Sequence, residues 1–276
     1  IGDRFDSDGR GFMASGKARN RATVVVLAVL VVVLALGATG AVGFLVWQQQ
    51  SAAAALREAK EAPLPAAEPL YEPKEDSLPL NPIDFEELRQ ENPDLYAWVY
   101  VPNTNVNLPV ARREGDDLFY LDHDRHGAYD ATGTVFSQTA NAADFSDPVT
   151  VLYGHNMANC AMFATLHDFS DPAFFAENEL FYVYVPGHIL TYRVVAAYNY
   201  DDRHILYSFG FADAAVREGY FASVLAPDDP QANVREGVVL DADSRIVQLS
   251  TCRSAYADDP VRYLVTGVLV DDQPTT

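Results

Sequence analysis

The segment RIVQLST (Arg245–Thr251), which leads into Cys252, and the later segment RYLVTGVLV (Arg262–Val270) decide the fold of this chain. Both runs are short, apolar and rich in β-branched residues, which is typical of buried β-strands. Cys252 follows the first run and Arg262 opens the second, ten positions later. If these two strands pair antiparallel, Cys252 and Arg262 lie at the same edge of a sheet.

Six further segments share this β-rich character and bring the number of expected strands to eight. They are Ala97–Pro102, Asn105–Val110, Gly133–Phe136, Val149–Tyr153, Leu180–Val185 and Ile189–Tyr200. Helical patterns occur at Met162–Phe169, Pro172–Asn178 and Phe211–Leu225, and Asn81-Pro82 predicts an N-cap for a helix over IDFEELRQ. Short strands at irregular intervals favour a mainly-β, closed or nearly closed barrel with peripheral helices.

The N-terminal part of the chain carries a predicted membrane anchor. Thr23–Trp47 is a run of 25 residues without a charged side chain, and a helix needs about 20 apolar residues to span a bilayer core. Lys17, Arg19 and Arg21 precede the run, and three glutamines follow it. Because positively charged flanks stay in the cytoplasm, we expect residues 1–22 to be a cytoplasmic tail, 23–47 a single transmembrane helix, and the remainder to lie outside the cell.

Two changes of composition divide the rest of the chain. Residues 48–80 are rich in Ala, Pro and Glu, which predicts an extended linker that holds a folded domain away from the membrane surface. The β-rich pattern begins soon after Asn81, so we expect one folded domain to occupy residues 81–271.

Charge and cysteine content exclude several classes of function. The formal net charge is −20, and the first 22 residues hold five basic and three acidic side chains, which leaves −22 for the remainder. Such a surface repels nucleic acid, so we expect no nucleic-acid partner. The two cysteines, Cys160 and Cys252, are too few for a disulfide framework or a cysteine zinc site. Cys160 leads into the apolar segment AMFATLHDF, so we expect it to be buried and unpaired. The family resemblance described below implies no metal and no organic cofactor.

Two strand ends carry residues suited to covalent chemistry. Val149–Tyr153 ends in Gly154-His155, and Arg245–Thr251 ends in Cys252. If these strands are parallel neighbours, His155 and Cys252 emerge at one edge of the sheet. A cysteine becomes a strong nucleophile beside a basic or cationic group, and a histidine can pass a proton to a leaving amine. A fixed guanidinium, such as that of Arg262, can stabilise the negative charge that develops on an acyl oxygen.

Each of these residues also has an ordinary structural interpretation. An isolated cysteine is usually a small core residue, an isolated histidine a surface group, and an isolated arginine a member of a surface ion pair. A disulfide between Cys160 and Cys252 is a further alternative for a domain outside the cell. Taken singly, these interpretations prevail. The strand-end pattern and the family resemblance given next together reverse the balance.

Leu249-Ser250-Thr251-Cys252 resembles the signature that precedes the nucleophile in the sortase family. YGHNM (153–157) resembles the histidine motif of that family, and Arg262 matches its arginine. Three longer segments are similar to class B sortases: the entry to the domain (85–110), the segment after the histidine (154–169) and a helical insertion (202–227). The resemblance extends over residues 80–270.

The resemblance implies an eight-stranded sortase-type β-barrel on the outer face of a Gram-positive membrane. It implies that Cys252 attacks, His155 protonates the leaving group and Arg262 stabilises the oxyanion, with Ser250 and Thr251 lining the substrate groove. The implied substrates are secreted surface proteins or pilins with a C-terminal sorting signal, and the acceptor is an amine of the cell wall precursor or of a pilin. An acidic residue that some class B members have two positions after the cysteine is Ser254 here, so no carboxylate role transfers to it.

Two other functions remain open from the sequence. A hydrolytic cysteine endopeptidase would release the thioester to water with the same three residues. A non-catalytic, membrane-tethered binding module would carry an inert Cys252.

Overall fold

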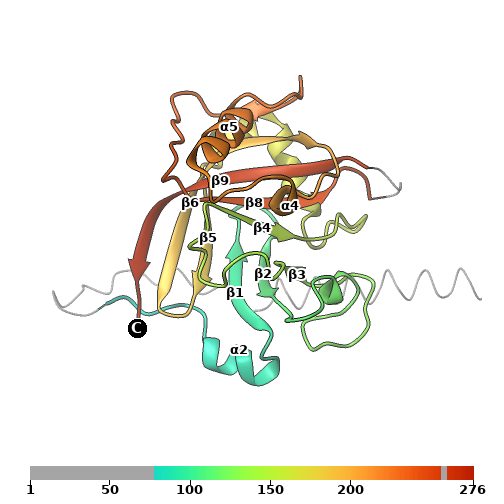
Figure 1. Ribbon diagram of the computed structural model, residues 1–276. Coiled ribbons are helices and arrows are strands. Elements are labelled where there is room, and N and C mark those ends of the chain that lie inside the picture. Colours follow the sequence, from blue (N-terminus) through green and yellow to red (C-terminus); the bar gives the residue numbers. More distant parts are fainter. Residues whose placement is uncertain (1–77, 256–259) are drawn as a thin grey trace, which may run out of the picture. The chain divides into compact units, whose positions relative to one another are not determined.

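A β-sheet that closes on itself organises the residues that the computed structural model describes, 78–255 and 260–276 (Figure 1). Its strands follow the order β5-β1-β2-β3-β4-β8-β9-β6, and β6 also pairs with β5, which closes a ring of eight strands. The short strand β7 is added to β6 outside this ring. The strands are β1 (Leu95–Tyr100), β2 (Asn107–Ala111), β3 (Val135–Phe136), β4 (Val149–Tyr153), β5 (Leu180–Val185), β6 (His188–Tyr200), β7 (Asn233–Val234), β8 (Ile246–Cys252) and β9 (Arg262–Pro274). The predicted eight-stranded barrel is confirmed.

Six short helices surround the barrel. They are α2 (Phe85–Glu91), η1 (Phe119–Leu121), η2 (Ala164–Ser170), α3 (Pro172–Glu177), α4 (Ile205–Ser208) and α5 (Ala214–Leu225), where η marks a 3-10 helix. The helices α3 and α5 lie where the sequence predicts them, and the predicted helix at Met162–Phe169 is the 3-10 helix η2. The sequence did not predict η1 or α4.

The predicted N-cap at Asn81 is wrong. The cap of α2 is Asp84, whose carboxylate accepts hydrogen bonds from the backbone N–H groups of Glu86 and Glu87. Asn81 instead accepts from the backbone of Ile83 and donates to the carbonyl of Val185. A carboxylate at the start of a helix also interacts favourably with the positive end of the helix dipole. Asp84 therefore satisfies the free N–H groups better than an amide three residues upstream.

Both faces of the barrel wall are buried. Inward-facing side chains such as Val99, Phe181 and Leu249 fill the interior. Side chains on the opposite face of β4, β6, β8 and β9 pack beneath α5, which lies over this part of the wall (Figure 1). Phe221 of α5 is fully buried there, and burial of a side chain of this size contributes about 1.5–3 kcal/mol. This two-sided burial holds β8 and β9 rigidly, and these strands carry four of the five predicted site residues.

The predicted cytoplasmic tail (1–22), transmembrane helix (23–47) and nearly all of the linker (48–80) lie outside the described residues. Within 78–255 and 260–276, none of the helices combines the length and the apolar character needed to span a bilayer. The domain boundaries therefore remain predictions.

Candidate active site

The pairing of three strands sets the position of the predicted site residues. β4 and β8 are parallel neighbours, with Tyr153 opposite Ser250. β8 and β9 are antiparallel, with Cys252 opposite Arg262. Both pairings are the conditions on which the sequence argument for a common edge depended, and the structure meets them. They bring the C-terminal ends of β4 and β8 and the start of β9 to one edge of the barrel wall.

A cavity of about 290 Å³ opens at this edge. His155, Cys252 and Arg262 all line it, together with Ser250 and Thr251. The structure thus brings together all five residues that the sequence singled out.

His155 is held by its neighbours in sequence and by η1. The backbone N–H of Gly154 donates to the carbonyl of Ser250 at 3.1 Å, and the N–H of Phe163 donates to the carbonyl of His155 at 2.9 Å. A Cβ atom on Gly154 would come within 2.8 Å of the Phe163 ring, so this turn requires glycine. The Nε2 atom of His155 lies 2.7 Å from the carbonyl oxygen of Leu121 in η1. Because a carbonyl only accepts, Nε2 carries a hydrogen, and Nδ1 is the ring nitrogen that exchanges a proton while this bond persists.

Cys252 is a free, partly buried thiol at the last position of β8. Its backbone carbonyl accepts a hydrogen bond from Nδ2 of Asn156 at 3.0 Å and lies 3.1 Å from Nε2 of His167. The sequence analysis did not identify Asn156 or His167. Both occur in the segment 154–169 that carries the histidine motif, but no sequence pattern shows that they reach Cys252.

Ser250 and Thr251 are almost completely buried, with exposed fractions of 5 % and 2 %. The hydroxyl oxygen of Thr251 has no hydrogen-bond partner within the described part of the chain. Both residues line the cavity. Because so little of their surface is exposed, they shape the cavity more than they make direct polar contacts with its contents.

The loop that follows β6 supplies much of the opposite cavity wall, which the sequence analysis missed. Asp201, Asp202, Arg203 and His204 all line the cavity. Nε2 of His204 lies 2.6 Å from Oε1 of Gln138, and its ring stacks on Tyr207 with centroids 4.2 Å apart. The sequence signal that could have indicated this wall is the polar run DDRH, which directly follows a long predicted strand.

Cys160 is unpaired, as predicted, but it is exposed and not buried. Its backbone adopts a positive φ of 63° in a turn closed by its N–H on the carbonyl of Met157. The turn directs Cys160 outward, and Met162 and Phe163 fill the core in its place.

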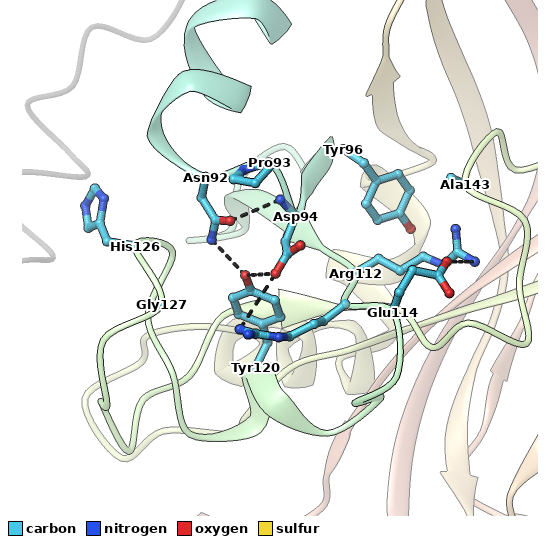
Figure 2. A pocket seen from close by; sticks show the side chains of 11 residues that line it. Asn92, Pro93, Asp94, Tyr96, Arg112, Glu114, Tyr120, His126, Gly127 and Ala143 are labelled. Atoms are coloured by element: carbon cyan, nitrogen blue, oxygen red, sulfur yellow. Dashed lines mark hydrogen bonds and ion pairs between the residues drawn. The ribbon is translucent and has the colours of Figure 1, made fainter.

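A larger hollow of about 650 Å³ lies elsewhere and contains none of the predicted residues (Figure 2). Several of its polar side chains pair with one another, although the buried Nε atom of Arg112 has no hydrogen-bond partner among the described residues. The hydroxyl of Tyr120 accepts from Asn92 at 2.7 Å and donates to Asp94 at 2.8 Å, and Arg112 pairs with Glu114 at 3.1 Å. Burial raises the pKa of Tyr120 to about 12. The hollow is therefore a structural network, and the smaller cavity beside Cys252 is the candidate site.

No group of three or more potential metal ligands of the His, Cys, Asp or Glu type occurs among residues 78–255 and 260–276.

Known proteins are similar to this chain over the same region. A family model described as the sortase domain matches residues 99–270. Sortase B of Listeria monocytogenes is 26 % identical over 189 residues, which cover 68 % of this chain and 74 % of that protein. The crystal structure of Clostridium perfringens sortase B superimposes with a TM-score of 0.61 at 27 % identity, over 68 % of this chain and all of the other. A Streptococcus pyogenes class B sortase involved in pilus biogenesis matches with a TM-score of 0.58 at 26 % identity, over 68 % and 98 % of the two chains.

Proposed function

The chain belongs to the sortase family of cysteine transpeptidases, and from this premise we propose that it joins secreted proteins to an amine through a thioester at Cys252. In this proposal the acyl donor is a C-terminal sorting signal of a secreted surface protein or pilin. The acceptor is an amine of the cell wall precursor or of a pilin. Similarity to a Streptococcus pyogenes class B sortase that is involved in pilus biogenesis supports the pilin as one of these classes.

One observation carries the assignment of the residues. His155, Cys252 and Arg262 come from three different strand ends and line a single cavity. Such a convergence of nucleophile, proton carrier and fixed cation is what acyl transfer requires.

The proposed reaction has two halves. The thiol of Cys252 gives its proton to His155 as its sulfur attacks the scissile carbonyl carbon, and the guanidinium of Arg262 stabilises the oxyanion. The C–N bond then breaks, the leaving amine takes a proton from His155, and the acyl group remains on sulfur as a thioester. The incoming amine attacks that carbon, gives a proton to His155, and releases Cys252 as the C–S bond breaks.

We further propose that the catalytic domain lies outside the cell and is anchored by residues 23–47. The uncharged run in this segment and the basic residues before it support this orientation. Protease treatment of intact cells tests this orientation, because it distinguishes an external domain from an internal one.

The reaction is tested with a library of sorting-signal peptides and a short amine peptide as acceptor. Mass spectrometry should find the acyl half of the cleaved peptide on Cys252 and then on the acceptor. Cys252→Ala should abolish both species because no thioester can form, and Cys160→Ala should retain both. Cleavage without any ligated product, at all acceptor concentrations, would identify a hydrolytic endopeptidase instead. No cleavage and no acyl-enzyme with any peptide would contradict the proposed function.

A further inference from the structure

The backbone carbonyl of Cys252 is held by two side chains that the reaction scheme does not use. We propose that Asn156 and His167 are positioning residues that clamp this carbonyl and so hold the thiol of Cys252 in place for attack. The inference rests on the proposed role of Cys252 as nucleophile.

The register of β8 and β9 leaves this carbonyl without a partner in β9. The N–H of Arg253 donates to the carbonyl of Val261 at 3.2 Å, and hydrogen-bonded pairs alternate with non-bonded pairs in an antiparallel ladder. The pair formed by Cys252 and Arg262 is therefore non-bonded. The carbonyl of Cys252 consequently points toward the β4 side of the sheet.

The parallel ladder between β4 and β8 ends just before it could bind this carbonyl. Its last bond runs from the N–H of Gly154 to the carbonyl of Ser250. Two residues further along each strand, the partner of the Cys252 carbonyl is the side-chain amide of Asn156 at 3.0 Å. The same Nδ2 atom lies 3.4 Å from the carbonyl of Arg253. Asn156 thus replaces a ladder bond that the chain cannot form after it turns at Gly154.

His167 completes the clamp from η2. Its Nε2 atom lies 3.1 Å from the carbonyl oxygen of Cys252 and 3.0 Å from Nδ2 of Asn156. Its ring stacks on Tyr263 of β9, with centroids 4.5 Å apart and planes inclined by 28°. The stack fixes the ring, and the two short distances place its Nε2 atom beside both the carbonyl of Cys252 and the amide of Asn156.

The charge state of His167 suits this role. Burial lowers the pKa of its imidazole, against the opposing effects of the Cys252 carbonyl and the Asp168 carboxylate. The ring is therefore neutral at pH 7, and its Nε2 atom either donates to the carbonyl or accepts from Asn156. Both arrangements keep the three groups together without a buried charge beside the nucleophile.

The clamp is needed because Cys252 is the last residue of its strand. β8 ends at Cys252 and β9 begins at Arg262, and the last residue of a strand can fray unless further contacts hold it. Asn156 directly follows His155, so one amide links the proton carrier to the nucleophile. A small displacement between reacting groups lowers the rate strongly, which gives the clamp a catalytic consequence without any contact to substrate.

Two substitutions of His167 separate the hydrogen bond from packing. His167→Phe keeps a ring to stack on Tyr263 and removes the polar contact, whereas His167→Gln keeps a donor and an acceptor and removes the ring. In the full chain, we expect His167→Phe to lower kcat about five- to tenfold with KM unchanged, the size of effect expected when one bond that holds a reacting group is lost. We expect His167→Gln to recover most of this loss.

Asn156→Ala should lower kcat at least as much as His167→Phe. The exposed residue His126 provides the control, since His126→Phe should leave kcat unchanged.

The melting temperature of each variant and the acyl-enzyme on Cys252 are measured together with kcat and KM. The inference is overturned if His167→Phe has wild-type kcat, or if Phe and Gln at position 167 impair kcat equally. It is also overturned if kcat falls only in proportion to lost folded protein. If the wild-type chain itself forms no acyl-enzyme at Cys252, the proposed function is wrong and the inference falls with it. A wild-type acyl-enzyme together with unaffected variants removes the inference alone.

Discussion

Arg262 shows what a single side chain contributes in this site. It lies opposite Cys252 in the pair formed by β8 and β9 and lines the same cavity. We predict that Arg262→Lys lowers kcat by about 100-fold although the positive charge is kept. The planar guanidinium reaches an oxyanion from a fixed direction, whereas a lysine ammonium is a point charge on a flexible stem. Steady-state transpeptidation and the rate of acyl-enzyme formation both measure the effect, and full activity of the lysine variant would contradict the oxyanion role while leaving Cys252 as nucleophile.

The lowered pKa of His167 predicts how acid changes the stability of the domain. Burial lowers the pKa of the folded imidazole below its ordinary value of 6.5, so the unfolded chain binds a proton more readily than the folded chain. The free energy of unfolding therefore decreases as the pH falls below about 6.5, and the decrease continues until the folded pKa is reached. The groups that contact or neighbour the ring are the Cys252 carbonyl, Asp168 and the Tyr263 ring.

The measurement compares the melting temperatures of the wild type and His167→Gln at about pH 7.5 and about pH 5.5. We expect acidification to lower the melting temperature of the wild type more than that of the variant. Asp168 is present in both proteins, so the difference between them reports on His167. Equal losses in the two proteins would show that His167 titrates normally in the folded state.

Among the elements, the 3-10 helix η1 connects the two hollows of the domain. Tyr120 is anchored in the larger hollow by Asn92 and Asp94 (Figure 2), and the next residue, Leu121, offers its carbonyl to His155. Gly133 packs against this turn of backbone: a Cβ atom on it would lie 2.6 Å from the Tyr120 oxygen and 2.7 Å from the Leu121 oxygen. A residue far from Cys252 in sequence therefore controls the position of the carbonyl that binds His155.

We predict that Gly133→Ala lowers both stability and kcat, because the added methyl group displaces the Leu121 carbonyl. Gly127→Ala is the matched control. Both glycines have positive φ, 64° and 79°, but a Cβ atom on Gly127 meets nothing within 4 Å. Both variants should lose about 1 kcal/mol of stability from the unfavourable backbone conformation, and only Gly133→Ala should lose substantially more together with activity. Equal losses of stability and equal kcat in the two variants would show that η1 does not position His155.

The elements that the sequence predicted are those with a strong local pattern. The apolar segment at Val149–Tyr153 and the β-rich segment at Leu180–Val185 have the predicted bounds as β4 and β5. In contrast, η1 is three residues long and depends on the distant contacts of Tyr120, and β7 is two residues paired to β6. Such short elements are fixed by tertiary contacts that no local pattern records.

The same limit applies to the site. The sequence located His155 and Cys252 because each follows or ends an apolar strand, and parallel neighbouring strands bring such residues to a common edge. Asn156 and His167 act through contacts between a side chain and the Cys252 carbonyl, 96 and 85 positions away in sequence. Only the folded barrel makes these contacts visible.

At the scale of the whole domain, the first and last described residues are joined to each other. The N–H of Thr276 donates to the carbonyl of Pro79 at 3.0 Å, and the N–H of Asn81 donates to the carbonyl of Thr276 at 3.2 Å. The side chain of Asn81 also donates to the carbonyl of Val185 in β5 at 2.9 Å. The segment just before α2 therefore closes one end of the barrel, although it belongs to no helix or strand.

These contacts predict where the domain can be shortened. A protein that begins at Leu78 should fold by itself and bind all of these partners. One that begins at Asp84 retains the cap of α2 but loses the three hydrogen bonds named above and the packing of Ile83. It also loses two longer contacts of the Asn81 side chain, at 3.4 Å and 3.3 Å. At about 1 kcal/mol for each bond, the loss is about 3 kcal/mol, which lowers the melting temperature of a domain of this size by roughly 6–12 °C.

Circular dichroism and thermal unfolding of the two shortened proteins measure this difference, and Asn81→Ala in the longer protein should reproduce part of it. Equal melting temperatures would show that the segment before Asp84 contributes nothing to the barrel. If the protein that begins at Leu78 is unfolded while the full chain in detergent is folded, the domain needs residues before position 78, and the predicted boundary at Asn81 is wrong. A folded and active shortened protein would instead show that the anchor serves location alone, because the barrel holds Cys252, His155 and Arg262 without it.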